Sequence, residues 1–165
     1  MISMKDTLKI YRRSIMAISL INLILGAFIA GFGFNAIFTD MAVPKNVVAA
    51  FIFGMKIAYG SGLSLEFLFL LIGMFFVWIF YKDGQGDVGA MASFTASALL
   101  HIFTLSYAYM VVLTYEAGNI LHPVKLIGDL VLWGGAGLLY MLLITLDIVL
   151  LGAAHTKIKR GEAQR

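Results

Sequence analysis

The feature that most constrains this chain is the placement of its charged residues, which lie in short clusters separated by long apolar stretches. The stretches cover residues 14–38, 63–81, 89–115 and 124–154. A run of about 18 or more apolar residues is long enough to cross the hydrocarbon core of a bilayer as a helix. The sequence therefore predicts an all-α integral membrane four-helix bundle, which forms a single domain over residues 1–165.

The composition of the chain agrees with this interpretation. Hydrophobic residues make up 61% of the sequence and charged residues 13%, whereas about a quarter of the residues of a soluble domain are charged. The sequence contains no cysteine, which excludes disulfides and thiolate-bound iron–sulfur, zinc or copper sites within this chain. The net charge of +3 does not indicate nucleic-acid binding, because the basic residues flank the apolar stretches.

The basic residues also predict the orientation of the chain in the membrane, since cytoplasmic loops carry an excess of lysine and arginine. With the N-terminus inside, nine basic residues lie on the inner side, namely Lys5, Lys9, Arg12, Arg13, Lys82, Lys157, Lys159, Arg160 and Arg165. Three lie on the outer side, namely Lys45, Lys56 and Lys125. We therefore expect a multi-pass protein of the cytoplasmic (inner) membrane with both termini in the cytoplasm.

A further apolar run, residues 46–59, follows Pro44 and ends before Gly60-Ser61-Gly62. One helix from Pro44 to Tyr81 would be far longer than the hydrocarbon core of about 30 Å, because a helix rises about 1.5 Å per residue. We therefore expect residues 46–59 to form a separate interfacial or re-entrant helix on the outer side. The alternative is a single long helix that projects beyond the bilayer.

Polar residues inside the predicted spans are the candidates for function, because ionisable groups within a membrane are costly and mark ion paths and proton relays. The helical rise places Asn22, His101 and Asp147 in the inner half of the membrane. The sequence thus predicts one polar layer that could form a proton or ion path. The alternative is a set of interhelical hydrogen bonds that fix packing, each worth about 1 kcal/mol or less.

His101 is also a candidate single ligand for haem or for a chlorophyll-type pigment. A bis-histidine haem within the chain is not expected, because His122 lies at the outer edge of the bundle and His155 at the inner edge. The sequence has no metal-ligand spacing of the H-E-x-x-H kind, so no metal site is expected. We expect no cofactor to be bound by this chain alone, and a quinone, haem or pigment would lie at a subunit interface.

A second set of polar residues falls near the predicted outer edge and includes Glu66, His122 and Asp129. Charges near the interface are tolerated because long side chains reach the headgroups, so a solvated or paired rim is the simple interpretation. The alternative is a pocket for a quinone or lipid headgroup. Glu66 is the best member of such a pocket, because the adjacent glycines leave room beside it.

The layout of the second span resembles that of the DoxX/DoxD-like four-helix membrane proteins. The comparable stretch begins with the link at Pro44 and continues through LEFLFLLIGMFF, residues 65–76, with an acidic residue at Glu66 and a glycine at Gly73. The resemblance covers roughly half of the chain. It implies a quinone-linked or oxidoreductase-associated membrane subunit.

Three features favour a non-catalytic accessory subunit of a multi-subunit membrane complex, respiratory or otherwise electron-transferring. The chain has no redox ligands of its own, no soluble catalytic domain, and spans rich in glycine, methionine and aromatic residues that suit packing against partner subunits and lipids. The alternative is a small oligomeric transporter or channel lined by Asn22, His101 and Asp147. A membrane enzyme that uses His101 or Glu66 is a third hypothesis.

Overall fold

The computed structural model describes the backbone of residues 4–38, 47–117 and 123–163, and the side chains of residues 7–31, 60–104 and 135–160. The described backbone forms four helices: α1 (Met4–Phe38), α2 (Val47–Asp83), α3 (Asp87–Ala117) and α4 (Pro123–Ala163). The prediction of an all-α fold is confirmed, and each helix contains one of the predicted spans.

Three of these helices carry segments that are long and apolar enough to cross a membrane. Within the part of the chain whose side chains are described, the segments are Thr7–Gly31 in α1, Gly60–Asp83 in α2 and Gly135–Arg160 in α4. Many large apolar side chains on these segments lie on the outside of the bundle, among them Ile24, Phe75 and Leu142. An apolar outer surface of this kind is stable against lipid tails and is typical of a membrane protein.

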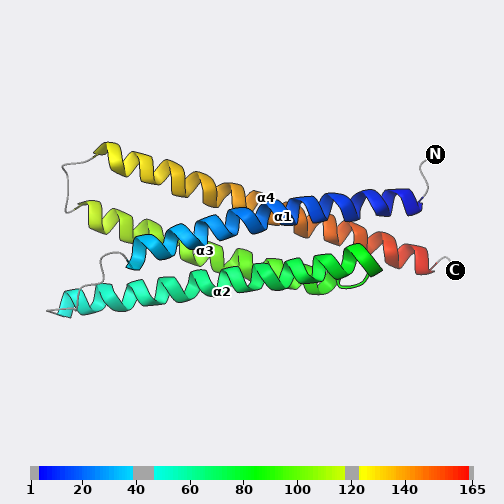
Figure 1. The fold of residues 1–165 in the computed structure, drawn as a ribbon, viewed down its shortest axis with the longest axis horizontal. Helices are drawn as coiled ribbons and strands as arrows, with labels where there is room; N and C mark the ends of the chain where they lie inside the picture. Colours follow the sequence, from blue (N-terminus) through cyan, green and yellow to red (C-terminus); the bar gives the residue numbers. More distant parts are fainter. Residues whose placement is uncertain (1–3, 39–46, 118–122, 164–165) are drawn as a thin grey trace.

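The four helices run antiparallel to their sequence neighbours and close into a ring. Each helix packs along the helices before and after it, and α4 packs against α1. Both chain termini and the short turn between α2 and α3 lie at the same end of the bundle, which we call the terminal end (Figure 1). Termini on one side of the membrane, as the basic residues predict, require this arrangement.

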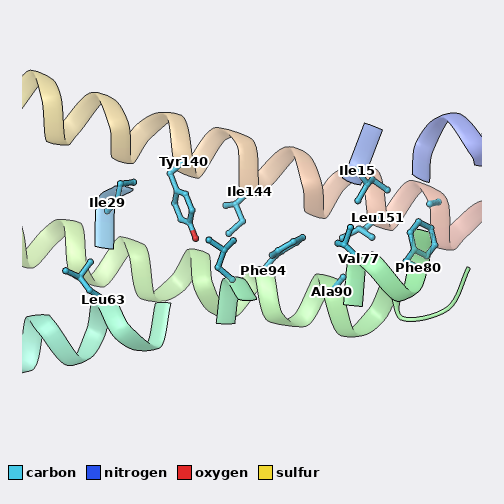
Figure 2. Close-up of a cluster of buried hydrophobic side chains, with 12 residues drawn as sticks. Ile15, Ile29, Leu63, Val77, Phe80, Ala90, Phe94, Tyr140, Ile144 and Leu151 are labelled. Carbon is cyan, nitrogen blue, oxygen red and sulfur yellow. The ribbon is translucent and has the colours of Figure 1, made fainter. Parts of the chain in front are cut away.

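The interior of the bundle follows a seven-residue repeat. On α4 the buried positions are Gly137, Tyr140, Ile144, Asp147, Leu151 and Ala154, separated alternately by three and four residues. This spacing is that of helices that pack side by side with a left-handed supercoil. Figure 2 shows apolar members of this core, with Tyr140, Ile144 and Leu151 following one another along α4 towards the terminal end. Several core positions are nevertheless polar, and these form the candidate site.

The expected break at Gly60-Ser61-Gly62 is wrong, because residues 47–59 and the second span belong to the single continuous helix α2 (Figure 1). The hydroxyl of Ser64 donates a hydrogen bond to the carbonyl of Gly60, one turn earlier in the same helix. Gly62 faces α3, where a Cβ atom would come within 2.9 Å of the methyl carbon of Thr104. This glycine therefore permits close helix packing and does not form a joint.

The loop between α2 and α3 is a tight turn, as the glycines of its sequence indicate. Gly84 and Gly86 have positive φ angles of 75° and 94°, which glycine adopts without steric cost. The amide of Gly84 donates to the carbonyl of Phe80, which closes the end of α2. Asp87 lies in the first turn of α3 and pairs with His155 of α4, so α4 is fastened to this turn at the terminal end.

Candidate functional site

Two groups of buried polar side chains occupy core positions of the bundle. The first, the Glu66 cluster, contains Glu66 of α2, Ser97, His101 and Thr104 of α3, and Tyr140 of α4. The second, the Asp147 cluster, contains Ser19 and Asn22 of α1 and Asp147 of α4. Ionisable groups at such positions are unusual in a membrane protein and mark a functional site by default.

The centre of the Glu66 cluster is a contact between a carboxylate and an imidazole. Oε1 of Glu66 lies 2.6 Å from Nδ1 of His101, and the hydroxyl of Thr104 donates to Oε2 of Glu66 over 2.9 Å. Glu66 is 3% exposed and His101 1% exposed. Both carboxylate oxygens of Glu66 thus have a hydrogen-bond partner.

A second set of hydrogen bonds links this pair to α4. The hydroxyl of Ser97 donates to the backbone carbonyl of Glu66 over 3.0 Å and lies 2.7 Å from the hydroxyl of Tyr140. The rings of His101 and Tyr140 are 4.7 Å apart between centroids. The Glu66 cluster therefore connects three helices through polar contacts that hold the imidazole in one orientation.

The Asp147 cluster connects α1 to α4, which are also neighbours in the ring. Oδ2 of Asp147 accepts hydrogen bonds from the hydroxyl of Ser19 over 3.0 Å and from the amide of Asn22 over 2.9 Å. All three side chains are buried. The described part of the chain contains no basic side chain paired with Asp147. An ionised Asp147 carboxylate would therefore be stabilised by hydrogen bonds from two neutral donors.

An apolar layer separates the two clusters. Tyr140 and Asp147 lie on the same face of α4, about 10 Å apart along its axis, at about 1.5 Å per residue. The space between them contains the buried side chains of Leu70, Phe94 and Ile144, and Figure 2 shows Phe94 and Ile144 beyond the hydroxyl of Tyr140. Because proton transfer requires contact within hydrogen-bond distance or through one water molecule, this layer interrupts any path between the clusters.

Within the part of the chain that the structure describes, three buried polar atoms of these clusters have no hydrogen-bond partner: Nε2 of His101, Oδ1 of Asn22 and Oδ1 of Asp147. A buried polar atom without a partner costs about 1–3 kcal/mol. Buried polar atoms of this kind are often explained by a functional role, such as catalysis or the binding of an ion. Both clusters therefore keep capacity to bind a proton, an ion or a ligand atom.

The structure brings Asn22 and Asp147 into contact but gives His101 a different partner. The sequence placed these three residues in one layer, whereas His101 lies in the other cluster, beyond the apolar layer. The polar layer of the prediction is thus two clusters at different depths. The misplacement arises because the helical rise gives depth only roughly, while the neighbours across the interface decide the contacts.

Glu66 is buried inside the bundle and paired with His101, so it is not a solvated residue of the rim. It is 17 residues from the end of α2, and His101 is 14 residues from the start of α3. Since α2 and α3 are antiparallel and joined by a short turn, the two residues reach the same level, about 21 to 26 Å from that turn. This register, together with the core spacing of Leu63, Glu66 and Leu70, is the signal that could have predicted the pair.

The other two predicted rim residues, His122 and Asp129, lie outside the residues whose side chains the structure describes. Within the described residues, no group of three or more histidine, aspartate or glutamate side chains could hold a metal ion. His101 does have the feature of a ligating histidine, since a carboxylate holds one ring nitrogen and the other has no partner among the described residues. Its role as a single haem or pigment ligand stays a prediction.

Comparison with models of protein families, with curated protein sequences and with solved structures gave no match to this chain. The resemblance to the DoxX/DoxD-like proteins therefore stays a prediction.

Proposed function

We propose that this chain is a proton-handling membrane protein in which Asp147 and the Glu66–His101 pair bind and release protons inside a four-helix bundle. The observation that supports this most is the burial of a carboxylate–imidazole pair 2.6 Å apart among helices suited to a membrane. Carboxylate and histidine groups inside membrane bundles typically form proton relays. Histidine exchanges protons near neutral pH, which suits such a relay.

The proposal includes four membrane spans and cytoplasmic termini. The helix α3 packs along both α2 and α4, so it follows these two apolar helices through the bilayer. At the terminal end the described basic side chains are Lys9, Arg12, Arg13, Lys82, Lys157, Lys159 and Arg160, against the acidic Asp83 and Asp87. An excess of basic residues favours the cytoplasmic side.

In this proposal the Asp147 cluster exchanges protons with the cytoplasmic side, to which it lies closer. The Glu66 cluster holds the next proton position, where the proton moves between Oε1 of Glu66 and Nδ1 of His101. Thr104 keeps the carboxylate in place, while Ser97 and Tyr140 hold the polar contacts towards α4. The layer of Leu70, Phe94 and Ile144 acts as the barrier, so transfer between the clusters needs a movement or hydration of this layer.

The experiment is proton flux into liposomes that contain the purified chain, with a pH-sensitive dye inside and an imposed potential. We expect flux with the unaltered chain and its loss in Asp147→Asn and in Glu66→Gln. Thr145→Ala is the matched control, because Thr145 is exposed on α4 and bonds only to the carbonyl of Met141 in its own helix. Flux that persists in Asp147→Asn, in protein that is folded and correctly inserted, would contradict the proposal.

A second candidate function is the non-catalytic accessory subunit, in an electron-transferring complex as the resemblance implies. The observation in its favour is that the polar contacts join neighbouring helices in pairs, α1 with α4, α2 with α3 and α3 with α4, as packing clamps would. This candidate predicts no flux by the chain alone. It also predicts that partner subunits remain bound during purification from the native membrane, which mass spectrometry of the purified material would detect.

A further inference from the structure

A basic pocket lies at the terminal end of the bundle, between the first turns of α1 and the last turn of α2. It has a volume of about 530 Å³ and is lined by Leu8, Lys9, Arg12, Arg13, Tyr81 and Lys82. Four of these six residues are cationic, and none is acidic. None of the residues that line the pocket belongs to either polar cluster, and the proposed proton function does not involve it.

Arg12 is held in this pocket by the turn between α2 and α3. Its guanidinium lies over the ring of Phe80, 5.5 Å from the centroid. It also packs against Gly84, where a Cβ atom would come within 2.1 Å of a terminal guanidinium nitrogen. The arginine is therefore fixed in position before any ligand binds. Its Nε atom is buried and has no hydrogen-bond acceptor among the described residues.

Among the described residues, the two carboxylates that follow Lys82 in sequence do not line this pocket. Asp83 is exposed and is not part of the lining. Asp87 pairs with His155 on α4. A fixed guanidinium with spare donor capacity, surrounded by three further cations, is complementary to a phosphate group, because arginine donates paired hydrogen bonds to phosphate oxygens.

The position of the pocket indicates what carries the phosphate. Arg12 and Lys82 lie near the ends of the apolar segments Thr7–Gly31 and Gly60–Asp83. The proposed spans place these ends at the level where lipid headgroups meet the hydrocarbon core. Leu8 and Tyr81 supply apolar surface beside the four cations. Basic pockets between helices at this level bind the headgroups of anionic lipids. We propose that the basic pocket is a phosphate-binding site for the headgroup of an anionic phospholipid.

The test is native mass spectrometry of the full chain in detergent, titrated with phosphatidylglycerol or with phosphatidylcholine of the same acyl chains. We expect the anionic lipid to bind more tightly, and Arg12→Gln and Arg13→Gln each to weaken that binding about fivefold or more. Arg13 is exposed and lines the pocket, so its variant remains informative if Arg12→Gln fails to fold. Lys159→Gln is the control, since it removes an exposed charge on α4 outside the pocket.

Inorganic phosphate added to the same sample distinguishes a lipid headgroup from a soluble phosphate as the ligand of the pocket. No displacement of the lipid at millimolar phosphate supports a headgroup site, whereas full displacement supports a site for a soluble phosphate in the same pocket. Equal binding of the two lipids would overturn the proposal. An equal loss of binding in Lys159→Gln and Arg13→Gln would also overturn it, because it would show attraction to diffuse surface charge only.

Discussion

Gly73 gives the sharpest prediction about packing, because its contact is with the apolar layer between the two clusters. A Cβ atom at this position would lie 2.4 and 2.5 Å from two ring atoms of Phe94, whereas ordinary contacts are 3.4–4 Å. Phe94 is 0% exposed, so its ring is enclosed by other atoms of the core. Overpacking of this kind destabilises a core by about 1–3 kcal/mol. Alanine in place of glycine in a helix stabilises by about 0.5–1 kcal/mol, which offsets part of the loss.

The control for Gly73→Ala is Gly31→Ala. A Cβ atom at Gly31 would meet no other atom within 4 Å, and Gly31 is also within a helix. The gain in helix propensity is the same in both variants, so the difference between them reports the contact with Phe94. We expect Gly73→Ala to be less stable than Gly31→Ala by about 1–3 kcal/mol. The measurement is the free energy of unfolding by sodium dodecyl sulfate in mixed micelles.

A rescue variant makes this prediction specific to the contact. Phe94→Leu removes the ring, so adding it to Gly73→Ala should recover part of the lost stability. Equal stability of Gly73→Ala and Gly31→Ala would refute the close approach of α2 and α3 at this level. It would also refute the apolar layer as the proposed barrier.

Three further predictions concern the polar contacts and the turn, each measured as a free energy of unfolding. A double-mutant cycle of Asn22→Ala and Asp147→Ala should give a coupling free energy of about 0.6 kcal/mol, and at most about 1.7 kcal/mol. A coupling free energy of zero would exclude the hydrogen bond between these two side chains. His101→Ala should lower the free energy of unfolding by about 3–5 kcal/mol, because it leaves the buried carboxylate of Glu66 without its partner. Adding Glu66→Gln should recover most of this loss. No recovery would contradict the pairing of Glu66 with His101. Gly84→Ala should cost about 1–2 kcal/mol, because alanine resists a positive φ, and unchanged stability would contradict that conformation.

The helices of this fold could be predicted from the sequence because each apolar run is long and bounded by charges. The continuity of α2 through residues 60–62 could not be predicted from the sequence. Gly60 and Gly62 are equally compatible with a break in the helix and with close packing against a neighbouring helix. Only the packing of Gly62 against Thr104 decides between these interpretations. The role of a glycine within a helix depends on which residues pack against it, and these are determined by the tertiary structure.

The candidate site was predictable in part, for a related reason. Asn22 and Asp147 were expected at one depth, and they are in contact. Glu66 was assigned to the rim because the preceding helix was expected to end at the glycines. The register across the turn between α2 and α3, which does not depend on where α2 begins, places Glu66 opposite His101. One wrong element boundary thus changed the interpretation of a residue several positions away.

The central claim is that buried carboxyl groups of this bundle exchange protons with water, and infrared difference spectroscopy tests it most directly. The measurement records the carbonyl absorption of protonated carboxyl groups in membranes containing the purified chain while the pH is stepped. We predict a reversible band that is lost in Asp147→Asn or Glu66→Gln and is unchanged in Thr145→Ala. A spectrum without such a band at any pH, or a band unaffected by both carboxyl substitutions, would contradict the account and favour a structural role for the two clusters.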